Sequence, residues 1–305
     1  MRKKDITAAV AARLVASQFP QWADLPIRPV AADGWDNTTF RLGEELLVRL
    51  PSHKIYVPQV DKEHRWLPVL APQLALSIPE PVALGAPDGD FPRPWSVYRW
   101  IKGQTAATGT IESLSEFAAG VAGFLAALQG IDAAGGPKAG DHNFFRGGPL
   151  GTYDRDTRQA IDRLRGDLDT DAATALWDAA LCSAWDEPPV WVHGDMAPSN
   201  LLVEHGVLTA VIDFGCAAIG DPACDLVMAW TFFANESAEA FRRQLELDDA
   251  TWMRARGWAL WKALITLAQG KREGTSAAAA AQRAGWRRDP REVIELLLAE
   301  HRRET

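Results

Sequence analysis

Cysteines, long apolar runs and excess positive charge are all scarce in this chain, and each absence excludes a class of protein. The chain has three cysteines in 305 residues, and Cys182, Cys216 and Cys224 are spaced neither as a disulfide framework nor as a metal motif. No apolar run approaches the roughly 20 residues that a membrane helix requires, and the basic N-terminus lacks the apolar core of a signal peptide. We therefore expect a cytoplasmic protein that has no membrane partner.

Basic residues are outnumbered, and the formal net charge is -8 at pH 7. A protein that binds nucleic acid needs a basic face to neutralise phosphates, so we expect no nucleic-acid partner. The acidic residues gather in clusters at residues 167–171, 186–187 and 246–249. Most such clusters are solvated surface or helix caps, but they are also compatible with a cationic substrate.

Length and composition indicate a globular chain of enzyme size. Apolar residues make up 47% of its 305 residues, which is enough for one or two cores. Strand-like patterns precede Gly103, and helical patterns follow it. We therefore predict one domain over residues 1–102 and a second over residues 103–305.

Two short motifs carry the chemistry, HGDMAPSN at residues 193–200 and VIDFG at residues 211–215. A hydroxyl that attacks a γ-phosphate needs an acceptor for its proton, which Asp195 can provide. The amide oxygen of Asn200 and the carboxylate of Asp213 are hard ligands, and with the nucleotide's own phosphates they suffice for Mg²⁺. The spacing therefore predicts phosphoryl transfer.

The strands expected around these motifs agree with that interpretation. Short apolar and β-branched runs predict strands at Val190–Val192, Leu201–Val203 and Thr209–Ile212. Asp195 and Asp213 then lie at strand ends. The alternative is that these acidic residues only cap turns.

At these residues the chain resembles the aminoglycoside phosphotransferase family, which includes choline and ethanolamine kinases and other small-molecule kinases. The resemblance covers most of the chain. It implies an α+β, two-lobed protein-kinase-like fold with a small β-rich N-terminal lobe that binds nucleotide and a larger, mainly helical C-terminal lobe that holds the catalytic and acceptor sites. It also implies that Asp195 is the catalytic base and that Asn200 and Asp213 bind Mg²⁺.

A third family segment, GDPACDL at residues 220–226, follows the metal motif, and we expect its Asp221 and Asp225 to brace the catalytic loop. Two features of protein kinases are missing. Ala197 stands where their catalytic loop has a lysine, and the chain after Gly215 leaves no room for a long activation loop. We therefore expect no protein substrate.

The predicted nucleotide lobe begins with a hairpin over residues 32–42. Its turn would bring the backbone N–H groups around Asn37 and Thr38 over phosphates, although an ordinary hairpin has the same pattern. The next strand, residues 46–50, carries Arg49 where the family has a phosphate-binding lysine. Glu63, on a helix predicted over residues 57–70, is its expected carboxylate partner, and Asp61 is the competitor.

The hinge between the lobes is expected after a proline-bearing edge strand at residues 78–85 and a further strand at residues 95–101. The resemblance implies that backbone groups near Arg99, Trp100 and Ile101 contact the adenine of the nucleotide. Periodicity predicts further helices over residues 111–128, 154–168, 172–185, 224–233, 238–245, 250–268 and 291–301.

Tryptophan is abundant, with 13 residues, and Trp258 and Trp261 share a face of one predicted helix. Aromatic faces bind quaternary ammonium groups, which would favour a choline-like acceptor. Core packing is the more frequent use of such residues.

Together these features predict an ATP-dependent, Mg²⁺-requiring kinase, with GTP as an alternative donor. The acceptor is a small-molecule hydroxyl, and an aminoglycoside-type antibiotic is the first choice. A choline, ethanolamine or sugar-metabolite kinase is the alternative within the same chemistry. A nucleotide-binding protein without turnover is the alternative outside it.

Overall fold

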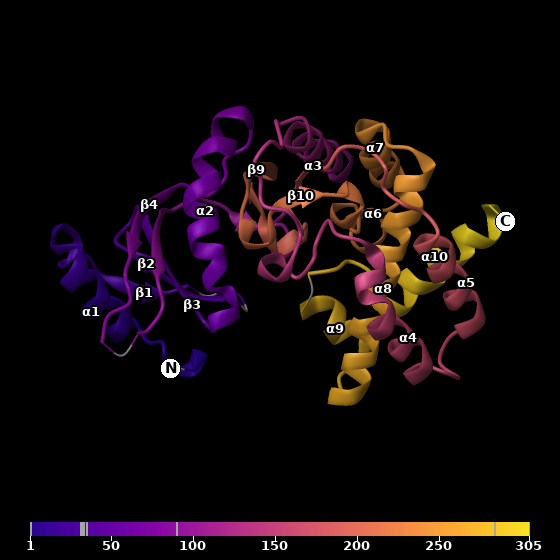
Figure 1. Cartoon of the computed structure of the whole chain (residues 1–305), viewed down its shortest axis with the longest axis horizontal. Coiled ribbons are helices and arrows are strands. Elements are labelled where there is room, and N and C mark those ends of the chain that lie inside the picture. The colour runs from indigo at the N-terminus through magenta and orange to yellow at the C-terminus, as the bar shows by residue number, and fades with distance from the viewer. Residues whose placement is uncertain (1, 31–33, 35, 90, 284, 305) are drawn as a thin grey trace. The chain divides into compact units, whose positions relative to one another are not determined.

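The computed structural model describes residues 2–30, 34, 36–89, 91–283 and 285–304, and the chain divides into two compact units (Figure 1). The first comprises Met1–Lys102 with Ala210–Cys216, and the second comprises Gly103–Thr209 with Ala217–Thr305. Residues 210–216, which carry Asp213, group with the first unit. The Val211 N–H donates a 3.0 Å hydrogen bond to the Ser77 carbonyl and so attaches this segment there.

The first unit is built on a five-stranded sheet in the order β1-β2-β3-β5-β4, in which every neighbouring pair is antiparallel. Its elements are α1 (Ala8–Gln18), β1 (Ile27–Pro29), β2 (Asn37–Leu42), β3 (Leu46–Pro51), α2 (Val57–Leu70), β4 (Pro81–Gly85) and β5 (Trp95–Arg99). Two predictions are confirmed, the helix over residues 57–70 and the edge position of the proline-bearing strand.

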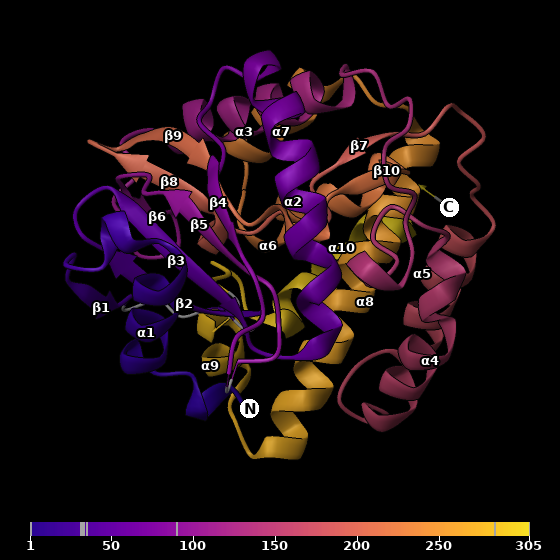
Figure 2. The same cartoon turned by 60° about the vertical axis from the view of Figure 1, so that its left-hand side comes forward.

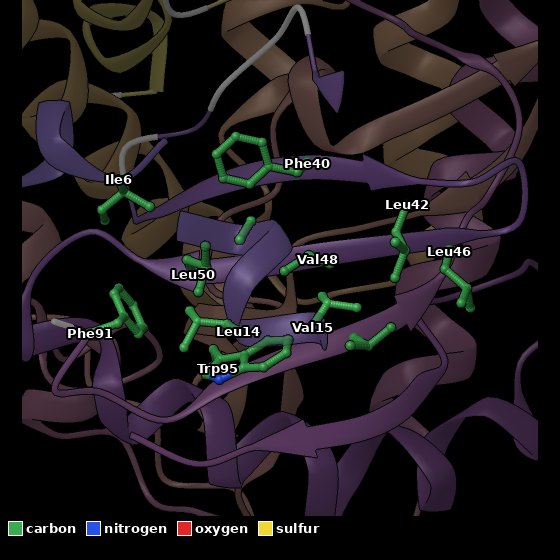
Figure 3. Close-up of a cluster of buried hydrophobic side chains, with 12 residues drawn as sticks. Ile6, Leu14, Val15, Phe40, Leu42, Leu46, Val48, Leu50, Phe91 and Trp95 are labelled. Carbon is green, nitrogen blue, oxygen red and sulfur yellow. The ribbon is translucent and has the colours of Figure 1, made fainter. Parts of the chain in front are cut away.

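Alternation along the strands sends side chains to opposite faces of this sheet. Val48 and Leu50 of β3 lie with Leu14 and Val15 of α1 in one buried cluster, which Figure 3 shows. Arg49, between them in sequence, points to the other face, where it meets a side chain of α2. The two helices therefore cover opposite faces, and the polar face belongs to α2.

The returning strand of the hairpin predicted over residues 32–42 is present, because Asn37–Leu42 form β2. β2 pairs antiparallel with β1 on one side and, after a turn at Gly43 with a φ of 58°, with β3 on the other. Pairing of Leu42 with Leu46 buries both leucines. Residues 31–33 and 35 of the expected turn lie outside the described part of the chain.

The second unit is mainly helical. Its helices are α3 (Leu114–Gln129), α4 (Asp154–Arg163), α5 (Thr170–Leu181), α6 (Met228–Thr231), α7 (Glu236–Leu245), α8 (Asp249–Glu273), α9 (Ala277–Arg283) and α10 (Pro290–Glu304). Its strands are β6 (Gln104–Thr105), β7 (Val190–Val192), β8 (Leu201–Glu204), β9 (Val207–Val211), which runs on into the first unit, and β10 (Ala218–Gly220). They form a β10-β7 pair and a β6-β8-β9 sheet.

Helix α8 lies at the centre of this unit and packs against α4, α5 and α10, while α3 packs against α7 (Figure 2). One of its two glycines, Gly257, permits the contact with α5, because a Cβ there would lie 2.7 Å from the Cβ of Ala180 and 2.5 Å from Leu150. The helix is buried on most sides, as is typical of a central helix. No helix of the described residues is long and apolar enough to span a membrane.

The predicted helix over residues 224–233 is wrong in detail. The chain forms a 3-10 helix at Pro222–Asp225 and the short α6 instead. All residues from 221 to 233 are buried, so the sequence has no polar face whose period could mark the interruption.

Candidate active site

The loop that carries Asp195 follows β7, which pairs with β10 through Val192 and Ala218. Gly194 has a φ of 80°, a conformation that favours glycine, and it turns the chain so that Asp195 leaves the strand end. The fully buried carboxylate of Asp225 accepts the N–H groups of His193, at 2.6 Å, and of Gly194, at 2.8 Å. Asp225 therefore braces the loop that carries Asp195, as the sequence predicted.

Asp221 has a different role from the one expected. Its carboxylate accepts a 2.7 Å hydrogen bond from Arg254 Nε of α8 and also accepts the Ala223 N–H at 3.0 Å. The pair with Arg254 is buried, with 4% and 10% of the two side chains exposed. Asp221 therefore anchors α8 to the 3-10 turn and does not contact the catalytic loop through this carboxylate.

The side chain of Asp195 is 41% exposed and lies among cations. Lys262 Nζ of α8 is 3.5 Å from Asp195 Oδ1. Partial burial works to raise the pKa of Asp195, but the positive charges of Lys262 and Arg146 outweigh it and hold the pKa below its usual value. The carboxylate is therefore ionised at neutral pH and able to accept a proton.

Asn200, at the end of the 3-10 helix Pro198–Asn200, is oriented by the same loop. Its Nδ2 donates to the Asp195 carbonyl at 2.9 Å and approaches Asp195 Oδ2 at 3.3 Å. Among the described residues, no group donates a hydrogen bond to the amide oxygen of Asn200, so this oxygen is left for another partner. A free amide oxygen is a suitable ligand for Mg²⁺.

In the first unit, Arg49 links two carboxylates. Its Nη2 lies 2.7 Å from Asp213 Oδ1, and its Nη1 lies 3.3 Å from Glu63 Oε1. Glu63 is 5% exposed and also accepts the hydroxyl of Tyr98, whereas Asp61 is exposed. Burial works to lower the pKa of Arg49, but the charges of Glu63 and Asp213 outweigh it and raise the pKa. The Arg49–Glu63 contact expected from the sequence is present.

Helix α2 also holds the segment that follows Asp213. Lys62 Nζ donates a 2.7 Å hydrogen bond to the Gly215 carbonyl, and burial lowers the pKa of Lys62 to about 8. Gln59 fills the space beside Gly215, where an added Cβ would lie 2.8 Å from Gln59 Oε1. Asp213 itself has a φ of 67°, unusual for a residue other than glycine. The α2 contacts hold this strained residue in place.

Asn37 and Thr38 lie at the start of β2, paired with Pro51 and Leu50, and not in a turn. Thr38 Oγ1 is buried and has no hydrogen-bond partner among the described residues. Such an orphaned hydroxyl suits contact with a ligand.

At the expected hinge, two backbone donors are already used. Arg99 N–H donates to the Glu80 carbonyl at 2.9 Å, and Trp100 N–H donates to the Glu45 carbonyl at 2.8 Å. Within the described residues, the N–H of Ile101 has no such partner. Ile101 is therefore the best placed of the three for a hydrogen bond to a base.

Three charged residues near these groups were missed from the sequence: Lys62, Arg146 and Lys262. Lys62 directly precedes Glu63, so the predicted helix could have revealed it. Lys262 follows Trp258 by four residues and shares its helix face, but nothing in the sequence places that face beside Asp195. Arg146 lies in a loop and had no pattern to mark it.

The motifs and their geometry agree with a comparison against known families. A family model described as the phosphotransferase enzyme family matches residues 27–259. The chain belongs to this family. It is therefore a small-molecule kinase.

Solved structures show the same fold at low identity. The GDP and kanamycin complex of an aminoglycoside phosphotransferase has 21% identity and a TM-score of 0.70, with 97% of this chain and 99% of that chain covered. A streptomycin–ATP complex of another has 19% identity and a TM-score of 0.60, with 95% and 98% covered. A macrolide 2'-phosphotransferase from Brachybacterium faecium has 22% identity and a TM-score of 0.59, with 91% and 96% covered. No curated protein matches the kinase in sequence.

Proposed function

We propose that this kinase transfers the γ-phosphate of ATP, with GTP as an alternative donor, to a hydroxyl of a small molecule in the cytoplasm. The carrying observation is the environment of Asp195: an ionised carboxylate, partly open to solvent, on a loop that Asp225 fixes through two backbone hydrogen bonds. A carboxylate held in this way can accept the proton of an attacking hydroxyl.

Nucleotide binding is proposed for the first unit. Arg49 supplies a fixed cation for the phosphates of the nucleotide, and Glu63 holds Arg49 in place. Backbone groups around Asn37 and Thr38 also contact the phosphates, and the backbone from Arg99 to Ile101 contacts the base. In support, similar structures were solved with GDP, ATP or ADP. The orphaned Thr38 hydroxyl and the unused Ile101 N–H also suit this role.

The donor set fits Mg²⁺, because Asn200 keeps its amide oxygen available and Asp213 presents a carboxylate that is 32% exposed. We propose that these two residues hold the ion. When bound, Mg²⁺ would neutralise charge on the phosphates. Arg49 would then exchange its contact with Asp213 for the phosphates while keeping Glu63.

For the acceptor, an aminoglycoside-type antibiotic is supported by similar structures solved with kanamycin, streptomycin and gentamicin. A macrolide is supported by similar structures of macrolide 2'-phosphotransferases. Turnover of such a drug would make the kinase a resistance enzyme. The acidic clusters give less support to a cationic acceptor than the sequence suggested, because several of their carboxylates already have partners. Asp167 pairs with Lys271, Asp169 caps α5, and Asp248 caps α8.

Choline receives no support from the tryptophans, because their faces already hold a cation. The guanidinium of Arg146 lies 4.4 Å from the ring centroid of Trp261 and 5.5 Å from that of Trp258.

The test of the proposed function is Asp195→Ala. We expect kcat to fall by about 10² to 10⁴, the usual effect of removing a positioned base. Nucleotide affinity, measured by calorimetry, should change little, because Asp195 serves the acceptor. ADP release in a screen of hydroxylated acceptors gives the rate.

The matched control is Asp178→Ala, which removes a carboxylate that is 52% exposed and pairs with Arg158 at the surface. Its kcat should equal that of the unaltered enzyme. Full turnover by Asp195→Ala would refute the role of the base. If the unaltered protein bound nucleotide but released ADP with none of the acceptors, the alternative of a nucleotide-binding protein without turnover would be favoured.

A further inference from the structure

A small cavity beside Asp195 is lined by hydrogen-bond donors. Arg146, Trp258, Trp261 and Lys262 all contribute to its wall, together with Asp195 itself. The side chains of the first four offer donors and no acceptors. Asp195 is the one carboxylate among the described residues of this wall. The cavity therefore carries two positive charges against one negative charge.

The guanidinium of Arg146 is packed among aromatic rings. It lies near the rings of Tyr153, Trp258 and Trp261, with centroid distances of 5.4, 5.5 and 4.4 Å. Across the described chain, no side chain or backbone oxygen accepts a hydrogen bond from this guanidinium, and none of the salt bridges includes it. Packing against three rings restricts the planar fork, so less entropy remains to be lost when a carboxylate or phosphate binds.

The two tryptophans add donors of their own. Trp258 and Trp261 are 1% and 5% exposed, and neither indole N–H has a partner among the described residues. Buried indole N–H groups usually have a partner. A ligand oxygen in the cavity can supply one.

Lys262 completes the set. Its Nζ is 3.5 Å from Asp195 Oδ1, and its side chain is 23% exposed. An ammonium group has three donors, so Lys262 can contact Asp195 and a ligand oxygen at the same time.

We infer that Arg146 and Lys262 form an oxyanion subsite beside Asp195, and that the acceptor carries a carboxylate or phosphate group in addition to its hydroxyl. The inference rests on the proposed function, because it assigns the acceptor of that site. A polycationic aminoglycoside would place ammonium groups against two fixed cations, which costs binding energy in a partly desolvated site. The nucleotide is the other source of an oxyanion, and the experiment separates the two.

The first arm measures binding without turnover. The kinase is saturated with Mg²⁺ and a non-hydrolysable ATP analogue, so that its nucleotide phosphate contacts are occupied, and is titrated with inorganic phosphate and with glycerate at constant ionic strength. We expect saturable binding that Arg146→Gln and Lys262→Gln each weaken at least tenfold. Arg165→Gln and Lys271→Gln are the matched controls, because both are exposed cations paired with surface aspartates, and they should leave binding unchanged.

The second arm measures turnover with acceptors that differ in charge: glucuronate, glucose 6-phosphate, glucose, glucosamine and kanamycin. We expect the anionic members to have the highest kcat/KM and to lose that advantage in Arg146→Gln, while the KM for ATP stays unchanged. A rise in the KM for ATP alone would assign the two cations to the nucleotide and overturn the inference.

Three further outcomes would also overturn it: no saturable anion binding in the first arm, binding that the two variants leave intact, or preference for glucosamine and kanamycin. Failure of the proposed function has a different signature. In that case no acceptor releases ADP, while the binding arm still reports whether the subsite exists.

Discussion

At the scale of single residues, Arg49 shows why an arginine can replace the lysine usual in this family. A planar fork contacts two carboxylates at once, here Glu63 and Asp213, whereas an ammonium group acts as a compact point charge. The sequence predicted the contact with Glu63 because the strand and helix that carry the two residues were clear. It could not predict Lys262 beside Asp195, because their approach depends on the packing of a helix distant in sequence.

Arg49→Ala should therefore raise the KM for ATP and lower kcat, because both nucleotide placement and transition-state charge depend on this cation. Arg49→Lys should recover part of the loss. Glu63→Gln should do less harm than Arg49→Ala, because the cation remains. Steady-state kinetics with varied ATP measures all three.

Arg49→Ala should also reduce stability by about 3 to 5 kcal/mol, the usual cost of leaving a buried charge without its partner. Urea unfolding measures this change. Arg28→Ala is the control, because this arginine is 67% exposed and meets Glu44 only at 3.9 Å. Unchanged ATP kinetics in Arg49→Ala would mean that another cation of the first unit binds the phosphates.

At the scale of elements, periodicity predicted the helices that have one apolar and one polar face. It did not predict the boundaries of segments that are buried on all sides. The helix over residues 57–70 was predicted with correct bounds, and the one over residues 250–268 only in part, since α8 extends from Asp249 to Glu273. Its end at Gly274, with a φ of 65°, is a left-handed cap that the alanine-rich segment after it did not reveal. The start of α8 is capped by Asp248, whose carboxylate accepts the Thr251 N–H at 2.8 Å.

Removal of this cap should show a defined pH dependence. Hydrogen bonds from Thr251 hold the pKa of Asp248 below its usual value. Because the pKa of Asp248 is lower in the folded state, its carboxylate stabilises the folded state at pH values above the unfolded pKa of about 3.9. This contribution is lost as the pH falls through the pKa of the folded state. Asp248→Ala should therefore cost about 1 kcal/mol at pH 7, and less as the pH falls below about 4.

Urea unfolding at several pH values, followed by tryptophan fluorescence, measures this difference. The control is Asp186→Ala, at an exposed loop position, which should change stability by less than about 0.5 kcal/mol throughout. A cost for Asp248→Ala that stayed constant down to pH 3 would mean that the carboxylate charge does not contribute to the cap.

At the scale of the whole molecule, the chain has two compact units, and the proposed metal ligands are divided between them. Asn200 belongs to the second unit, while Asp213 belongs to the first, although the two motifs are close in sequence. Composition and strand patterns predicted the division of the fold into a β-rich and a helical part. They could not show that residues 210–216 leave the helical part, because the hydrogen bond from Val211 to Ser77 joins segments distant in sequence.

This division leads to a test of whether both ligands serve one ion. A ligand that binds only the folded state stabilises it by about 2.7 kcal/mol at 100 times its Kd. ADP should raise the thermal midpoint of unfolding, and Mg²⁺ should add a further rise, the Mg²⁺ increment. EDTA should remove the Mg²⁺ increment. Asn200→Ala and Asp213→Asn should each abolish the Mg²⁺ increment and keep the ADP effect seen in EDTA. Asparagine is chosen at position 213 because it tolerates the positive φ there.

The double variant decides the question. If both residues bind the same ion, each single change removes the whole increment, and the double variant loses no more than either one, a strongly non-additive result. Asp24→Ala, at an exposed position of the first unit, is the control and should keep the full increment. An increment that survived in one single variant would remove that residue from the metal site. Losses that were partial in each single variant and additive in the double variant would instead mean that Asn200 and Asp213 act on separate ions.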